Sequence, residues 1–364
     1  MFADNDRISQ RQAARQMVLT LLGPFFWLLS GRGAAGGYPE LLGILLGGLL
    51  LILWIFFLVR LENIYHHLEE FVGNAAGMLI RAVYFSYLIF SGVCLLERMT
   101  YLSGTYLLDG ISNRWIGLLI LLAVFFGMSG KIQQRARMAE ALYPWILWST
   151  AVLLLLALGQ IHPGAFALAW EQTAEEIRRL GGDIVWKKIL KGVSETLQVG
   201  LIVSFLPFLL PQVERNKSVV KPLAAGMAKL VLLAAAFSMI LFGTLGTKGT
   251  AQRQDPVLLL MSGTNLPGGF LERFDVIWMA VLLCALLFSM GSLLFWGELA
   301  LKRRIAGILL GAVVYLLTFC LPEMYQLQIL YENAVRYLYL PVFFGLTVIL
   351  EIARRMQKKE RDSG

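Results

Sequence analysis

Charged residues are scarce in this 364-residue sequence, where only 15% of positions are Asp, Glu, Lys or Arg. A soluble domain carries about a quarter. The deficit comes from long runs that hold no charge: Leu41–Val59, Ala82–Leu96, Trp115–Gly130, Ala141–Ile161, Val276–Gly297, Ile305–Pro322 and Tyr337–Leu350. Most of them reach or approach the roughly 20 apolar residues that a helix needs to cross a bilayer. The missing charge therefore predicts an integral membrane protein.

Residue types that carry enzyme chemistry are also few. The three cysteines lie in apolar stretches without CxxC or metal-ligand spacing, and the three histidines lie in predicted loops: Cys94, Cys284, Cys320, His66, His67 and His162. We interpret the cysteines as ordinary apolar residues and the histidines as surface residues. The sequence offers no nucleophile paired with a base and no phosphate-binding loop. It predicts a protein that is not an enzyme and that holds no metal and no other cofactor.

Hydropathy predicts about ten transmembrane helices. They lie near residues 10–31, 39–60, 78–102, 113–130, 138–160, 190–212, 222–246, 274–298, 304–321 and 333–353. No cleavage site of small residues follows the first apolar stretch, so we expect this span to be retained. The predicted fold class is an all-α polytopic membrane protein.

One set of loops and termini holds many of the Lys and Arg residues, and with ten spans all of these fall on the same side of the membrane. They are Arg7, Arg11, Arg15, Arg60, Lys131, Arg135, Arg137, Arg215, Lys217, Lys221, Lys302, Arg303, Arg304, Arg354, Arg355, Lys358, Lys359 and Arg361. The positive-inside rule makes this side cytoplasmic, with both termini in the cytoplasm. The net charge of +8 then reflects topology, and we expect no nucleic-acid partner.

A longer outer loop divides the chain into two halves. Residues 162–189 have alternating apolar and charged faces, which predict an amphipathic helix at the outer interface. This connector separates a first five-helix repeat, residues 1–161, from a second, residues 190–353, and a basic cytoplasmic tail follows at 354–364. A further outer loop near 247–272 is rich in Gly, Thr and Pro and is a candidate lid.

Helix-breaking residues interrupt the first span of each half. The interrupting residues are Leu22, Gly23, Pro24 and Phe25 in span one and Ser204, Phe205 and Pro207 in span six. Proline removes a backbone N–H, and lipid cannot satisfy the freed carbonyl. Paired interruptions at equivalent positions are typical of the substrate site of inverted-repeat transporters. Two simple proline kinks are the alternative interpretation.

Three short segments stand at the entries to predicted spans. They are Arg7-Ile-Ser-Gln-Arg-Gln before span one, Arg137-Met-Ala-Glu-Ala-Leu-Tyr-Pro before span five and Phe270-Leu-Glu-Arg-Phe-Asp before span eight. In their order and positions they resemble the GerAB-type spore permeases, the B subunits of spore germination receptors, over nearly the whole chain. The stretches Gly23–Trp27 and Gly31–Pro39 and the place of Trp278 depart from the usual pattern of that family.

The resemblance implies a fold and a function. The fold would be that of the amino acid/polyamine/organocation transporter superfamily, a LeuT-like five-plus-five inverted repeat with discontinuous helices 1 and 6. The function would be a permease-like subunit that senses a small germinant, usually an amino acid, in the inner membrane of a dormant bacterial spore. Such subunits are thought to work beside a larger A-type subunit and a lipoprotein C-type subunit. A secondary amino acid transporter and a structural membrane subunit with a degenerate site stay open as alternatives.

If the spans pack as the resemblance implies, the two interruptions face each other near the bilayer midplane. The candidate ligand-binding residues are Leu22, Gly23, Pro24, Phe25, Phe26, Tyr84, Tyr87, Ser204, Phe205, Pro207 and Ser289. Half-helix N–H groups suit a carboxylate, and exposed carbonyls suit an ammonium. Tyr84 and Tyr87 are three residues apart and share one helical face, but Tyr and Ser at this spacing also occur as helix-packing residues. No acidic residue lies near the centre of a predicted span, which favours a neutral zwitterion over a proton relay.

Overall fold

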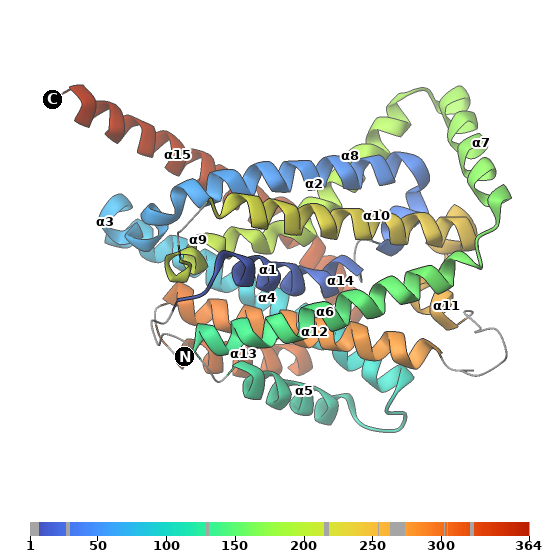
Figure 1. The fold of residues 1–364 in the computed structure, drawn as a ribbon, viewed down its shortest axis with the longest axis horizontal. Helices are drawn as coiled ribbons and strands as arrows, with labels where there is room; N and C mark the ends of the chain where they lie inside the picture. The colour runs from blue at the N-terminus through green and yellow to red at the C-terminus, as the bar shows by residue number, and fades with distance from the viewer. Residues whose placement is uncertain are drawn as a thin grey trace.

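The computed structural model describes residues 7–26, 30–128, 131–214, 218–253, 255–262, 274–301, 303, 305–320 and 324–363. Within those ranges the chain is helical and contains no strand, and one isolated parallel bridge joins Ile8 to Val213. The helices form one elongated bundle whose long axes run roughly side by side (Figure 1). This is the all-α architecture that the uncharged runs predict.

The helices follow the predicted spans closely. Their bounds are α1 Gln10–Pro24, α2 Ser30–His66, α3 Leu68–Val72, α4 Asn74–Tyr106, α5 Asn113–Met128, α6 Ile132–Leu158, α7 Pro163–Leu180, α8 Asp183–Gly200, η2 Leu201–Phe205, α9 Leu206–Leu209, η3 Leu210–Gln212, α10 Val220–Ala251, α11 Pro256–Ser262, α12 Phe274–Leu301, α13 Ile305–Cys320, α14 Met324–Ala334, η4 Val335–Tyr339 and α15 Leu340–Ser363. Seven stretches of described helix are long and apolar enough to cross a membrane, and α5 and α13 are shorter apolar helices. Predicted spans two to ten each overlap one of these nine elements, predicted span one corresponds to the shorter helix α1, and the count of ten stays a prediction.

Two glycines redirect the chain inside long helical stretches. Gly37 has φ +67° and Gly246 has φ +69°, a left-handed conformation that glycine adopts without steric cost. The helical segment before Gly37 therefore points away from the long helix that begins around Pro39. Both glycines lie at predicted boundaries, since predicted span two begins at residue 39 and predicted span seven ends at residue 246, but the helical turns beyond each glycine were not predicted.

Small residues let α2 pack tightly against α8 and α10 in the upper layer of Figure 1. A Cβ added to Gly47 would lie 2.7 Å from Cβ of Thr196 on α8, and one added to Gly43 would lie 2.9 Å from Cα of Gly192. Gly43 and Gly47 are one helical turn apart, the small-xxx-small spacing that brings membrane helices close together. These contacts fix α2 against the interrupted sixth span.

Large apolar side chains cover the outside of the bundle. Phe126, Trp145 and Trp148 are 90%, 76% and 72% exposed, and the leucines at 42, 46, 49 and 53 form an exposed stripe on α2. Such surface is unfavourable in water and favourable against lipid tails. The exposed surface thus agrees with a multi-pass membrane protein.

The predicted outer connector forms the helix α7. Its apolar residues Leu168, Trp170 and Ile177 are exposed, as an interfacial helix requires. The candidate lid is described at 247–253 and 255–262, where it continues α10 and forms α11, and the rest of it lies outside the described residues. In the text below, the basic end means the end of the bundle that holds Ile8, Lys131 and Arg303, at the left of Figure 1.

Candidate functional site

The first interruption follows Pro24. The N–H of Phe25 still donates to the carbonyls of Leu21 and Leu22, so Leu22, Gly23 and Pro24 are helical. The regular helix ends at Pro24, and a π-helical turn holds Phe25 and Phe26. The break was predicted over Leu22–Phe25, but the regular helix continues through Pro24. Pro24 removes one N–H and still leaves the φ and ψ of this turn helical.

The second interruption is a change of helix type. The α-helix ends at Gly200, and the chain continues as the 3₁₀-helix η2, one short α-helical turn and the 3₁₀-helix η3. Pro207 and Pro211 stand in the first turns of α9 and η3, where a helix has no use for their missing N–H. Ser204 and Phe205 lie in η2 and are fully buried.

A small central cavity lies between the two interrupted spans. Its volume is about 20 Å³, room for about one water molecule. It is lined by Pro24, Tyr87, Ser91, Cys94, Leu95, Val199, Ile202, Leu293 and Tyr331. The hydroxyls of Ser91 and Tyr331 are 3.4 Å apart, and none of the described residues that line the cavity is charged.

A second cavity of about 590 Å³ lies at the basic end, and we call it the vestibule. Its walls come from the end of α2, the starts of α4 and α6, the segment α9–η3, the end of α12 and Arg303. The lining residues are Tyr65, His66, Arg81, Lys131, Ile132, Pro207, Phe208, Pro211, Gln212, Phe295, Glu298, Leu299 and Arg303. The larger volume thus lies at the basic end, and the cavity between the two interrupted spans is small.

Four aromatic side chains separate the two cavities, and we call Tyr84, Phe205, Phe208 and Trp296 the aromatic barrier. Tyr84 packs edge-on against Phe205 and Phe208, with ring centroids 4.9 and 5.2 Å apart. Phe205 stacks on Trp296 at 5.6 Å. Phe205 also contacts Tyr87, which lines the central cavity, while Phe208 lines the vestibule. The rings thus form a continuous set of contacts from the wall of the central cavity to the wall of the vestibule.

The predicted site residues fall in several different places. Pro24 and Tyr87 line the central cavity, Pro207 lines the vestibule, and Tyr84 and Phe205 belong to the aromatic barrier. Ser204 is fully buried in η2 and lines neither cavity.

The remaining candidates pack inside the bundle away from the two cavities described above. Leu22 and Phe25 are buried in the core, and Phe26 contacts Phe237 and Trp278. A Cβ on Gly23 would lie 2.8 Å from the Leu286 side chain, so this glycine permits close approach of α1 and α12. The Ser289 hydroxyl donates to the Ala285 carbonyl of its own helix.

The sequence analysis missed Cys94 and Tyr331 as lining residues. Cys94 is 5% exposed and faces the central cavity, whereas Cys284 and Cys320 are exposed on the surface. Its spacing of three residues from Ser91 on α4 was the available signal. Tyr331 lies two residues before predicted span ten, and the helix in fact begins earlier, at Met324.

Arg135 was also assigned wrongly, to a cytoplasmic loop. It lies inside α6 and is only 4% exposed. Its guanidinium donates to the carbonyl of Phe288 (2.9 Å) and to the Ser292 hydroxyl, which lies 2.6 Å from that of Thr20. One buried cation thereby links α6, α12 and α1 just below the first interruption.

The end opposite the vestibule holds a buried ion pair. Arg98 of α4 contacts Asp255, which immediately precedes α11, and both side chains are less than a tenth exposed. Arg98 is one helical turn beyond Cys94 on the same helix. The pair thus joins α4 to the outer loop above the central cavity.

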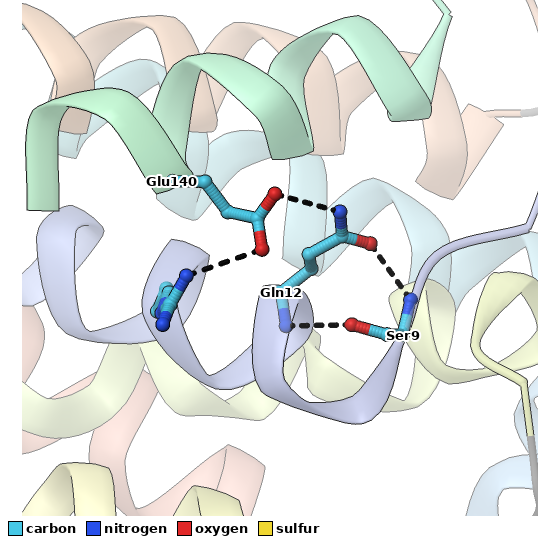
Figure 2. Close-up of polar contacts among 4 residues, drawn as sticks. Ser9, Gln12 and Glu140 are labelled. Atoms are coloured by element: carbon cyan, nitrogen blue, oxygen red, sulfur yellow. Dashed lines mark hydrogen bonds and ion pairs between the residues drawn. The ribbon is translucent and has the colours of Figure 1, made fainter. Parts of the chain in front are cut away.

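A polar clamp holds the start of α1. Figure 2 shows Glu140 of α6 reaching Gln12, while Gln12 and Ser9 form a capping box. The second carboxylate oxygen of Glu140 accepts from Arg15 at 3.1 Å. Backbone bonds from Ile8 N to Gln212 O and from Glu214 N to Ile8 O, each 2.9 Å, tie the same segment to the end of the sixth span.

Comparisons with known proteins add the following. A sequence profile of the family described as "spore germination protein" matches residues 7–321. The spore germination protein YndE of Bacillus subtilis (strain 168) is 22% identical over 331 residues, which cover 87% of each chain.

Among solved structures, a Na⁺-coupled sialic acid symporter in a substrate-bound outward-open state matches with a TM-score of 0.58 and 15% identity, over 96% of this chain and 77% of its own. The nucleobase-cation-symport-1 family transporter MHP1 matches over 94% and 81% with a TM-score of 0.47 and 15% identity. The symporter match confirms the expected fold class, a helical transporter-like membrane protein. These relatives are permeases and transporters, not enzymes.

Proposed function

The chain belongs to the spore germination protein family, and from this premise we propose that it is the permease-like subunit of a receptor that senses a small nutrient of the amino acid type. The observation that carries the proposal is the uncharged central cavity between the two interrupted spans. Hydroxyl groups line it, and an aromatic barrier separates it from the vestibule.

The chemistry of the central cavity suits a neutral or zwitterionic ligand. Pro24 lines the cavity and removes one N–H donor from the first interrupted span, and a carbonyl that lacks its usual donor can accept from an ammonium group. The hydroxyls of Ser91 and Tyr331 can donate to a carboxylate. A net charge on the ligand would be left uncompensated there, which is costly.

A volume of about 20 Å³ does not accept an amino acid, so binding requires a wider cavity. Tyr331 belongs to α14 and Pro24 to α1, and a small separation of these elements from α4 enlarges the space between them. A ligand that fits only the wider state shifts the population toward it. In a receptor this shift is the signal.

The test uses Gly23→Leu and Pro207→Leu in the intact receptor. Leu at position 23 collides with Leu286, and Leu at 207 changes the wall between barrier and vestibule. We expect the nutrient-induced germination response to be lost while the protein remains at its normal level in the membrane. A normal response in both variants would contradict the proposal.

Secondary transport of an amino acid is the second candidate. The likeness of fold to a Na⁺-coupled symporter and the vestibule below the aromatic barrier favour it. Uptake of a labelled amino acid into liposomes that hold the purified protein, driven by an ion gradient, distinguishes transport from sensing. A structural subunit with a degenerate site is the third candidate, favoured by the small central volume. Failure of every amino acid to stabilise the protein against heat would support it.

The proposed assembly and location rest on the same premise. We place the protein in the spore inner membrane, with both termini cytoplasmic, beside an A-type subunit and a lipoprotein C-type subunit. Co-purification of those two subunits with a tagged chain from spore membranes is the measurement. Recovery of the tagged chain alone would contradict this assembly.

A further inference from the structure

The vestibule carries more positive than negative charge. Among the described residues, Arg81, Lys131 and Arg303 line it together with the carboxylate of Glu298. Lys131 and Arg303 are exposed, and Arg81 is only 6% exposed. The positive-inside rule accounts for Lys131 and Arg303 at this end, but it does not account for a buried arginine in the cavity wall, Arg81.

Arg81 is held in a fixed orientation. Its Nε lies 2.8 Å and its Nη2 3.3 Å from the two carboxylate oxygens of Glu69, and its Nη1 donates to the carbonyl of Ala300. A guanidinium has five N–H groups in a rigid fork. Nη1 and Nη2 donate one N–H each to these partners, which leaves one N–H on each of them for a ligand without further ordering of the side chain.

The rest of the wall is suited to an organic body. Pro207, Phe208, Phe295 and Leu299 supply apolar and aromatic surface beside the cations. Low-dielectric walls strengthen the attraction between the fixed cations and an anion. A volume of about 590 Å³ lies within the usual range for small-molecule sites, about 300–1,000 Å³.

We propose that the vestibule is a second ligand site, which binds a small organic anion through a carboxylate or phosphate group. Lys131 and Arg303 attract the anionic group at the mouth, and Arg81 receives it deeper inside. The aromatic and proline walls hold the body of the molecule. The site is separate from the central cavity because the aromatic barrier lies between them.

The first experiment compares benzoate with its neutral analogue benzamide. Both are titrated into the full chain in phosphatidylcholine nanodiscs by calorimetry. We expect binding of benzoate and no measurable binding of benzamide. The double variant Lys131→Gln/Arg303→Gln should bind benzoate about tenfold more weakly, because two attractive charges are lost. Lys248→Gln, an exposed cation at the other end of the bundle, is the matched control and should leave the affinity unchanged.

The second experiment separates two sources of the anionic group. Benzoate affinity is measured again in nanodiscs that contain phosphatidylglycerol. A lower affinity there means that lipid headgroups reach the same cations, and an equal affinity assigns the site to free anions. Equal binding of benzoate and benzamide, or full affinity in the double variant, would overturn the proposal. This outcome says nothing against nutrient sensing, because the assay involves neither germination nor the central cavity.

Discussion

At the scale of single residues, the ion pair between Arg98 and Asp255 seals the end of the bundle opposite the vestibule. Both side chains are buried, so removal of one partner leaves an uncompensated charge, a cost of about 3–5 kcal/mol. The pair stands one turn beyond Cys94, whose thiol faces the central cavity. Its state should therefore control access of water to that thiol.

We expect Asp255→Asn to lower thermal stability and to speed the reaction of Cys94 with a water-soluble maleimide. The measurement uses a Cys284→Ser/Cys320→Ser background, in which Cys94 is the remaining cysteine. Arg179→Gln removes an exposed pair with Glu175 on α7 and is the control with little expected effect. Lower stability with unchanged labelling would mean that the pair supports the fold but does not close the bundle.

Individual site residues were only partly predictable from the sequence. Pro24 and Tyr87 were found because helix breakers and a three-to-four residue spacing are local signals. Arg135 was placed in a loop because a charged residue near a span end is ordinarily exposed. Its burial depends on acceptors from another helix, the Phe288 carbonyl and the Ser292 hydroxyl, which no local pattern reports.

At the scale of helices, the sequence predicted where each helix lies along the chain, but it did not predict the changes of direction and of helix type inside the helices. Each uncharged run corresponds to a helix, because crossing a bilayer demands an apolar stretch of fixed length. The breaks at Gly37 and Gly246 lie at predicted span boundaries, but the helical turns before Gly37 and after Gly246 fall in predicted loops, because polar, glycine-rich stretches carry no hydropathy signal for a helix. The change to a 3₁₀-helix at Leu201 begins before the proline that marked it.

Close packing of α2 against α8 gives the prediction at this scale. Gly47→Val places a branched side chain against Thr196, so the helices must separate or the side chain must adopt a strained rotamer, at about 1–3 kcal/mol. We expect a clear fall in the melting temperature of the purified protein. Gly345→Val on α15 is the matched control, because an added Cβ there meets no neighbour. Equal melting temperatures for the two variants would contradict the packing argument.

At the scale of the whole molecule, the two halves of the chain contribute one interrupted helix each to the central cavity. Pro24 comes from the first half, and Val199 and Ile202 come from the second. The inverted repeat itself stays a prediction of the family resemblance. A five-plus-five repeat has an even number of spans, so it predicts that both termini lie on the same side of the membrane.

Reporter fusions at the two ends check that topology. With Lys and Arg concentrated at the basic end, we expect a cytoplasmic reporter to be active at both termini. A periplasm-specific reporter fused after Gly181, between α7 and α8, should be active instead. Opposite results for the two termini would require an odd number of spans.

The stacking of Trp296 on Phe205 makes the molecule its own optical probe. An indole that leaves an aromatic stack for a hydrated space emits at longer wavelength. Any rearrangement that joins the central cavity to the vestibule should therefore shift the emission maximum of Trp296 to the red. Subtracting the spectrum of Trp296→Phe isolates this one fluorophore from the other eight tryptophans. A nutrient titration followed this way would time the opening step without any attached label.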